Sequence, residues 1–267
     1  DWVIRSAAVS SGSAEIMRAV ERAIPVFTRG AVLPELLADY TSVAVGGTHG
    51  KTTTSTFITQ VLRESGRDPS WCIGGESPEL GGVAGSGRGG FMVVEADESD
   101  GTIALYKPDV AVITNVEFDH MEHFESPEAF EGCFRRFAGN AKKAAVYCAD
   151  DPRAETICGA LENGVSYGFS QRAMVRGKKL NLSAGALNFL LEKNGKELGR
   201  IELPLPGRHN ALNALAVAAT CLELGLTFGE ISLGLRKAAF PRRRFEKIAE
   251  RDGITVISDY AHHPSEI

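Results

Sequence analysis

Short runs of apolar residues alternate with helical patterns along the chain, and this alternation restricts the possible fold more than any other feature. Strands that alternate with helices form βαβ units, in which the strands pair in parallel. The apolar runs cover 42–47, 91–95, 110–114 and 144–148, and helical patterns cover 52–64 and 127–137. The sequence therefore predicts an α/β fold with a mostly parallel sheet flanked by helices.

The pattern changes after about Ser166. Short alternating segments separated by Gly or Asn favour a small antiparallel β patch, at 180–183, 187–191 and 200–203. Helical runs follow at 209–224 and 228–238, and Phe240-Pro241 marks a hinge before a strand that begins at Thr255. The glycine-rich stretch 81–90 is predicted to be a loop.

The start of the chain predicts a strand–helix–strand unit at 2–9, 13–23 and 24–27, then a helical connector at 33–40. Ser13 is the expected N-cap of the helix. The unit is too small to be a domain, and both ends of the sequence look cut from a longer chain. We therefore predict three parts: 1–41 as a domain remnant with a connector, 42–239 as the central domain, and 240–267 as the start of another domain.

Composition excludes several classes of protein. The chain has 267 residues, of which 43% are hydrophobic and 24% charged, as in soluble globular proteins. Its net charge of −5 argues against a non-specific nucleic-acid binder. We expect no membrane helix, because no apolar run of about 18 residues occurs, and we expect no signal peptide. Five scattered cysteines without a C-x-x-C pair predict reduced thiols in a cytoplasmic protein.

A glycine-containing stretch between a strand and a helix, Gly46-Gly-Thr-His-Gly-Lys-Thr-Thr-Thr54, predicts a phosphate-binding loop. Small residues let backbone N–H groups point at phosphate oxygens, and the helix N-terminus adds positive potential. Lys51 would bind the β- and γ-phosphates, and Thr52 would hold Mg²⁺. Val45 stands where the ordinary Walker form has its first glycine, so the loop is a shortened variant. The alternative is a plain glycine turn before a helix.

An acidic run, Glu95-Ala-Asp-Glu-Ser-Asp100, follows the strand at 91–95. Parallel sheets bind ligands at the edge where their strands end. Four neighbouring carboxylates repel each other unless a cation neutralises some of them, and Mg²⁺ on a nucleotide takes oxygen ligands of this kind. The run therefore predicts a magnesium site, with a solvated acidic loop as the alternative.

Polar side chains also follow the strand at 110–114. Asn115, Asp119 and His120 would meet at the same sheet edge and could hold a second metal and a substrate carboxylate. The alternative for His120 is an ordinary core or surface histidine.

Two later stretches carry further candidates. His209, Asn210 and Asn213 cluster in the first turn of a long helix and could face a nucleotide base, unless Asn210 simply caps the helix. The arginines at 242–244 follow the hinge and could reach a phosphate, unless they form a surface charge run.

Together these stretches resemble the Mur ligase family, in its order and approximate spacing, over essentially the whole chain. The resemblance implies a central ATP-binding domain between parts of a UDP-binding domain and a third domain. It assigns ATP to Gly47, Thr48, His49, Gly50, Lys51, Thr52, Thr53, His209, Asn210, Asn213, Arg244 and Asp259. It assigns metal ions to Thr52, Glu95 and His120, catalysis to Lys51, Glu95 and His120, and substrate contacts to Gly74, Gly75, Asn115, His262 and His263.

The resemblance also implies the reaction, an ADP-forming amide ligation through an acyl phosphate, with ATP and Mg²⁺ as cofactors. The stretches 95–100 and 259–267 are most similar to the branch that adds L-alanine to UDP-N-acetylmuramate. The recycling branch that attaches a tripeptide to the same sugar, or another Mur or folylpolyglutamate-type ligase, stays open. Some branches carry a carbamylated lysine where this chain has Arg135 or Arg136, so we predict no modified lysine.

Two other classes remain as alternatives: a P-loop phosphohydrolase or kinase without amide chemistry, and a nucleotide-binding module without turnover. Neither requires the segments of His120 and Asp259 together. We expect the chain by itself to be inactive in ligation, since the UDP-binding loop of the family is not in this sequence. The oligomeric state is not predicted.

Overall fold

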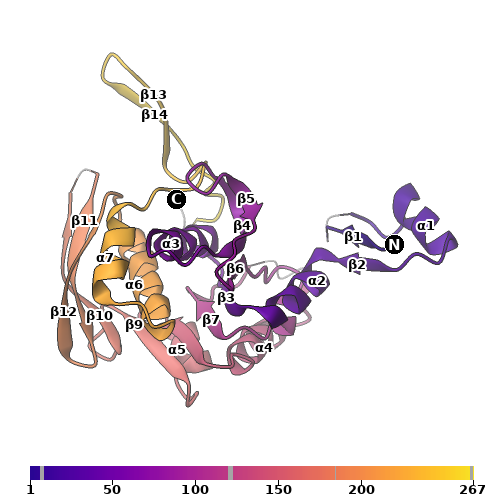
Figure 1. Ribbon diagram of the computed structural model, residues 1–267, viewed down its shortest axis with the longest axis horizontal. Coiled ribbons are helices and arrows are strands. Elements are labelled where there is room, and N and C mark those ends of the chain that lie inside the picture. Colours follow the sequence, from indigo (N-terminus) through magenta and orange to yellow (C-terminus); the bar gives the residue numbers. More distant parts are fainter. Residues whose placement is uncertain (7–8, 120–122, 184, 265–266) are drawn as a thin grey trace.

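The computed structural model describes residues 1–6, 9–119, 123–183, 185–264 and 267 (Figure 1). Its centre is a ten-stranded sheet with the strand order β12-β11-β10-β9-β8-β7-β3-β6-β4-β5. The strands are β3 (Thr41–Gly46), β4 (Ser70–Ser77), β5 (Gly82–Gly85), β6 (Phe91–Glu95), β7 (Val110–Ile113), β8 (Ala144–Cys148), β9 (Gly164–Gly168), β10 (Val175–Leu182), β11 (Leu187–Lys193) and β12 (Lys196–Leu203).

The middle of the sheet is parallel, from β4 through β6, β3, β7, β8 and β9 to β10, which confirms the predicted α/β class. Strands β10, β11 and β12 form the predicted antiparallel patch. The patch is hydrogen-bonded to β9, so it extends the main sheet instead of forming a separate one.

The other edge of the sheet differs from the prediction. Strand β5 lies inside the stretch 81–90 that was expected to be a loop, and it pairs antiparallel with β4. A Cβ atom at Gly85 would lie 2.2 Å from the indole of Trp71, so the Trp71 ring covers this glycine of the edge strand. Strand β4 was not predicted either, because Gly74 and Gly75 interrupt its side-chain pattern.

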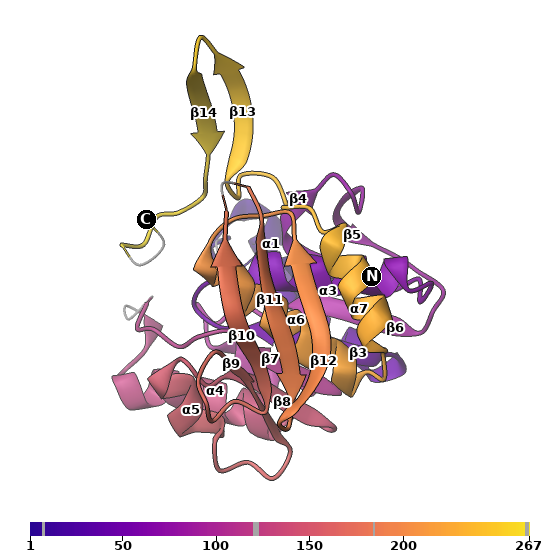
Figure 2. The same ribbon diagram turned by 90° about the vertical axis from the view of Figure 1, so that its left-hand side faces the viewer.

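Helices cover both faces of the sheet (Figures 1 and 2). One face packs against α3 (Lys51–Glu64), α6 (Arg208–Glu223) and α7 (Phe228–Arg236). The other packs against α4 (Pro127–Gly139) and α5 (Pro152–Cys158). In β3, Val43 and Val45 point into the first core and Ala44 into the second, as the two-residue period of a strand requires. Both faces are therefore buried, which explains the continuous apolar runs.

Local signals fix where several helices begin. The side chains of Ser126 and Asp151 each accept a hydrogen bond from the N–H group three residues later, and a proline occupies the first turn in both helices. Thr227 and Glu230 form a capping box at the start of α7.

The two ends of the chain lie outside the main sheet. The first contains β1 (Val3–Arg5), α1 (Ala14–Glu21) and β2 (Val26–Thr28), followed by α2 (Arg29–Leu36) and the short helix η1 (Leu37–Asp39). Strand β1 is shorter than predicted, and residues 7 and 8 lie outside the described part. Ser13 is the N-cap of α1 as expected, but its side chain makes no capping hydrogen bond.

At the other end, β13 (Glu246–Arg251) and β14 (Ile254–Ser258) form an antiparallel hairpin that projects from the body of the molecule (Figure 2). The strand expected from Thr255 is thus the second arm of a hairpin. All five cysteines are free thiols, as predicted, and four of them are buried. Among the described residues, no helix has the length and apolar character needed to cross a membrane.

Candidate nucleotide and metal site

Three neighbouring strands bring the predicted site segments to one edge of the sheet. Strand β3 ends at the glycine-containing loop, β6 ends at the acidic run, and β7 leads into Thr114 and Asn115. The three strands are parallel and in register, with Val45 opposite Glu95 and Gly46 opposite Ile113. Two cavities, of about 780 and about 910 Å³, open at this edge and share His49, Gly50 and Arg244 in their walls. The edge is therefore where a ligand can bind.

The loop after β3 is held in shape by the segment after β7. The Thr48 hydroxyl donates to the Glu117 carbonyl and accepts from the Glu117 N–H, both at 2.9 Å. The His49 N–H donates to Asn115 Oδ1 at 2.8 Å, and Asn115 Nδ2 donates back to the His49 carbonyl at 2.9 Å. Asn115, predicted to contact substrate, thus supports the loop. These paired bonds fix the conformation of the loop.

Gly50 ends the loop in a left-handed conformation, with φ of +81°, directly before α3. A Cβ atom there would lie 2.7 Å from Asn213 Oδ1. Asn213 belongs to the second turn of α6 and also accepts a hydrogen bond from the Thr54 hydroxyl at 3.3 Å. Gly50 is therefore required both for its φ and for the close approach of α6.

Lys51 forms an ion pair that the sequence did not single out. Its Nζ donates to the carbonyls of Gly47 and Thr48, at 2.7 and 3.0 Å, and to Glu98 Oε1 at 2.8 Å. The Glu98 side chain is only 2% exposed. Burial raises the pKa of Glu98, and the Lys51 charge opposes that rise. The second oxygen, Oε2, has no hydrogen-bond partner among the described residues, so a cationic ligand here would be favoured.

The other carboxylates of the acidic run point to different partners. Glu95 Oε2 accepts the Gly74 N–H at 2.8 Å. Asp97 accepts the Ser99 N–H at 3.0 Å and lies 3.9 Å from Arg29. Burial by itself would raise the pKa of Asp97, but the bonds from Ser99 and the charges of Lys51 and Arg29 hold it below its ordinary value. The run is therefore not a uniformly solvated loop, since Glu98 is buried, whereas Asp97 stays half-exposed and Asp100 exposed.

The larger cavity gathers oxygen ligands suited to magnesium. Thr52, Glu95 and Asp119 line it together with Gly74 and Gly75. A hydroxyl, one or two carboxylates and water are the ligands Mg²⁺ prefers beside a nucleotide, so this donor set fits the implied ion. His120, assigned to a second metal and to catalysis, lies outside the described residues.

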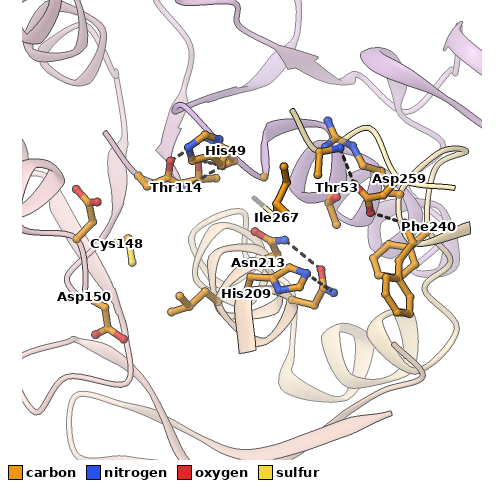
Figure 3. A pocket seen from close by; sticks show the side chains of 18 of the residues that line it. His49, Thr53, Thr114, Cys148, Asp150, His209, Asn213, Phe240, Asp259 and Ile267 are labelled. Atoms are coloured by element: carbon orange, nitrogen blue, oxygen red, sulfur yellow. Dashed lines mark hydrogen bonds between the residues drawn. The ribbon is translucent and has the colours of Figure 1, made fainter. Parts of the chain in front are cut away.

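The smaller cavity is lined by the residues predicted to bind the nucleotide (Figure 3). His49, Thr53, His209, Asn213 and Asp259 all face it. Burial lowers the pKa of His209, which favours its neutral imidazole.

Asn210 does not cap α6. The N-cap is Gly207, and Asn210 Nδ2 donates to the Pro206 carbonyl at 2.6 Å. The capping alternative is thus wrong, and Asn210 instead ties the helix start to the preceding turn. It also accepts from Asn213 Nδ2 at 3.3 Å, which links the two asparagines on the wall of the cavity.

Sequence reasoning missed part of this cavity. Cys148, Asp150 and Tyr167 line it, at or just beyond the ends of β8 and β9. The rule that singled out the ends of β6 and β7 would also have identified Asp150, because β8 was predicted as a strand of the same sheet. Asp150 accepts the N–H groups of Phe169 and Ser170, at 3.0 and 2.8 Å, so it shapes the wall of the cavity.

The segment after the hinge reaches both cavities. Asp259 accepts the N–H groups of Phe245 and Ala261, each at 2.7 Å, which holds the base of the hairpin together. The Arg244 guanidinium lies 5.3 Å from the centre of the Tyr260 ring and lines both cavities, so it is not part of a plain surface charge run. His262 lines the larger cavity.

The Gly74→Ala variant is expected to fold normally. Its affinity for ATP should increase less on addition of Mg²⁺ than the affinity of the wild type does. A Cβ atom at Gly74 would lie 2.3 Å from Glu95 Oε1, and the carboxylate is the mobile end of its side chain, so it would swing away. Displacing a metal ligand should lower metal affinity by roughly 10- to 100-fold. Titration of ATP binding at several Mg²⁺ concentrations measures this.

Gly139→Ala is the matched control, because a Cβ atom there meets nothing within 4 Å. Equal Mg²⁺ dependence in the Gly74→Ala variant and in the control would show that Glu95 does not hold the ion from this position.

These features define the class of the protein, a P-loop nucleotide-binding α/β protein. A glycine-containing loop joins a strand to a helix that begins with a lysine, and carboxylates follow the end of the neighbouring strand. The family model for the Mur ligase middle domain matches residues 45–221. The chain therefore belongs to the Mur ligase family.

Sequences of known ligases can be aligned with this chain over its whole length. It is 41% identical to a UDP-N-acetylmuramate–L-alanine ligase of Solidesulfovibrio magneticus, over 100% of this chain and 59% of the relative. The corresponding ligase of Acidothermus cellulolyticus is 42% identical, over 100% and 57%. The chain thus spans less than two thirds of the length of these relatives.

Two solved structures of ligases are also similar to this chain in fold. The UDP-N-acetylmuramate–alanine ligase of Thermotoga maritima matches with a TM-score of 0.89 at 30% identity, over 99% of this chain and 61% of that one. A UDP-N-acetylmuramate:L-alanyl-γ-D-glutamyl-meso-diaminopimelate ligase from Neisseria meningitides matches with 0.79 at 25% identity, over 90% and 80%.

Proposed function

We propose that this chain is the ATP-binding part of a ligase that joins L-alanine to UDP-N-acetylmuramate, releasing ADP and phosphate. One observation supports this proposal most strongly. Lys51, Thr52 and Glu95 lie together at one edge of the sheet, beside a cavity lined by His209 and Asn213. The names of the relatives, which match the chain from end to end, support the choice of substrates. Synthesis of a cell-wall precursor from soluble nucleotides agrees with a cytoplasmic location.

In this reaction the lactyl carboxylate of the sugar attacks the γ-phosphorus of ATP, the bond to the bridging oxygen breaks, and ADP leaves. The amine of L-alanine then attacks the acyl carbon, the amide bond forms, and phosphate leaves. The negative charge that gathers on the transferred phosphoryl oxygens must be met by fixed positive groups. Mg²⁺, when held by Thr52 and Glu95, would neutralise part of it.

Lys51 supplies the fixed positive charge from the protein itself. Its ammonium already sits at the loop on two carbonyl oxygens and Glu98. The loop therefore holds a cation in place before ATP arrives, so little reorganisation is needed when the phosphoryl group moves. The His120 side chain, outside the described residues, would hold the second metal that the family resemblance assigns.

The tripeptide-adding branch is the second candidate for the amine substrate. The structural match to the ligase of that branch is weaker, with a TM-score of 0.79 against 0.89. The discriminating experiment is product analysis of the natural full-length enzyme with UDP-N-acetylmuramate, MgATP, and either L-alanine or the tripeptide. We expect the L-alanine product; preferential formation of the tripeptide product would overturn this choice.

A further inference from the structure

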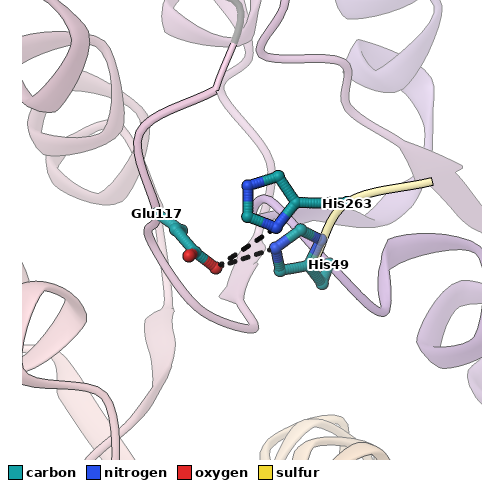
Figure 4. A group of neighbouring side chains, drawn as sticks. All are labelled: His49, Glu117 and His263. Atoms are coloured by element: carbon teal, nitrogen blue, oxygen red, sulfur yellow. Dashed lines mark hydrogen bonds and ion pairs between the residues drawn. The ribbon is translucent and has the colours of Figure 1, made fainter. Parts of the chain in front are cut away.

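Two histidines and a glutamate from three distant parts of the chain meet beside the phosphate-binding loop (Figure 4). His49 lies in the loop, Glu117 follows β7, and His263 lies in the segment after the hairpin. His49 Nε2 is 3.0 Å from Glu117 Oε2, and His263 Nδ1 is 3.9 Å from the same oxygen. The two imidazole rings are 4.9 Å apart between centroids. One candidate ligand atom of each residue lies within 4.8 Å of those of the other two.

We propose that His49, Glu117 and His263 form a binding site for a zinc-type divalent cation, separate from the magnesium site. Two imidazoles and one carboxylate are a zinc ligand set, and metal–ligand bonds of about 2.0–2.2 Å place tetrahedral ligand atoms about 3.3 Å apart. The two distances to the carboxylate, 3.0 and 3.9 Å, bracket that value, and all three ligand atoms lie within 4.8 Å of one another, so side-chain rotations admit the ion. The fourth position stays open for water or a phosphate oxygen.

The ligand atoms of this site favour a different ion from the Mg²⁺ that Thr52 and Glu95 would hold. Imidazole nitrogens favour zinc, copper or nickel, whereas hydroxyl and carboxylate oxygens favour magnesium. We therefore expect Zn²⁺ to bind at this site even when Mg²⁺ is present in excess, because Mg²⁺ should not compete for it.

Two of the three ligands are already fixed relative to each other. The reciprocal bonds between Thr48 and Glu117, and those between His49 and Asn115, join the loop to the segment after β7. The side chains are half-buried, with His49 18%, His263 22% and Glu117 39% exposed. Such support from surrounding hydrogen bonds orients ligands and raises metal affinity.

The position of His263 in the chain means that a bound ion would affect the movement of the C-terminal segment. His263 comes from the segment beyond the hinge, while His49 belongs to the phosphate-binding loop. A bound zinc ion would therefore fasten the C-terminal segment to the loop and restrict its movement. The proposed ligase function does not require this site, so a chain that binds no zinc could still be the ATP-binding part of the ligase.

The test uses the nucleotide-free 267-residue chain, Zn²⁺ in competition with a chromophoric chelator, and excess Mg²⁺ throughout. We expect one Zn²⁺ per chain, and affinity lowered by more than about tenfold in His263→Ala and in Glu117→Gln. Co²⁺ in place of Zn²⁺ should give the intense visible absorption of a tetrahedral site. Zn²⁺ should also protect the segment after 240 from protease in the wild type but not in His263→Ala.

Two histidine variants serve as controls, His123→Ala at an exposed position and His262→Ala next to the proposed ligand. Both should bind Zn²⁺ like the wild type. Absence of Zn²⁺ binding, or equal affinity in the wild type and His263→Ala, overturns the site. So does an equal loss in His262→Ala and His263→Ala, because the two adjacent histidines would then bind the ion by themselves.

Discussion

Lys51→Ala is expected to lose MgATP affinity by roughly 10- to 100-fold. A charge-assisted hydrogen bond contributes about 1.5–3 kcal/mol, and each 1.4 kcal/mol is tenfold in affinity. The side chain is only 16% exposed and sits at the loop, where phosphate oxygens would bind. Calorimetric titration of the chain with MgATP measures the loss. Lys196→Ala, which removes an exposed lysine on β12, is the matched control and should bind ATP normally.

The same change should also lower the stability of the fold. Without Lys51 the buried Glu98 loses its ion-pair partner and must either remain charged in a buried place or take up a proton, and breaking a buried pair costs about 3–5 kcal/mol. Thermal unfolding measures this loss. Lys51→Ala combined with Glu98→Gln removes the uncompensated charge, so it should regain most of the stability but not the ATP affinity. Unchanged ATP binding in that folded double variant would contradict the assignment of Lys51.

The 267-residue chain by itself is expected to bind MgATP and to form no measurable amide from UDP-N-acetylmuramate and L-alanine. Closure over the nucleotide excludes water and completes a catalytic site. Here the β13–β14 hairpin projects from the body of the molecule, with Ile248, Ile254 and Val256 exposed (Figure 2). An acyl phosphate formed in so open a site would be exposed to water.

Contacts far from the reacting carboxylate often raise turnover itself, and the relatives of this chain are considerably longer than it is. The assay compares the chain with the natural full-length enzyme under identical conditions, using mass spectrometry of the product. Ligation by the chain alone at an ordinary enzyme rate of about 1–10³ s⁻¹ would show that it already carries all the parts the chemistry requires.

Local patterns determined the parallel core and the strand–loop–helix unit that carries Lys51. Val43–Val45 and Val110–Ile113 are continuous apolar runs because both faces of their strands are buried, so their sequence alone indicates that environment. Gly50 and Lys51 likewise show their role locally, since a left-handed glycine before a helix and a lysine at its first residue act within one turn of chain.

Tertiary structure decided the rest. Lys51 and Glu98 are separated by 47 positions, and nothing in the acidic run shows which of its carboxylates will be buried against the loop. Strand β4 could not be predicted from side-chain alternation, because Gly74 and Gly75 have no side chains that would indicate which face of the strand is buried. The approach of His263 to His49 depends on how the chain turns after Pro241. A sequence pattern records propensity and period over a few residues, whereas such contacts are set by the free energy of packing segments that are distant along the chain.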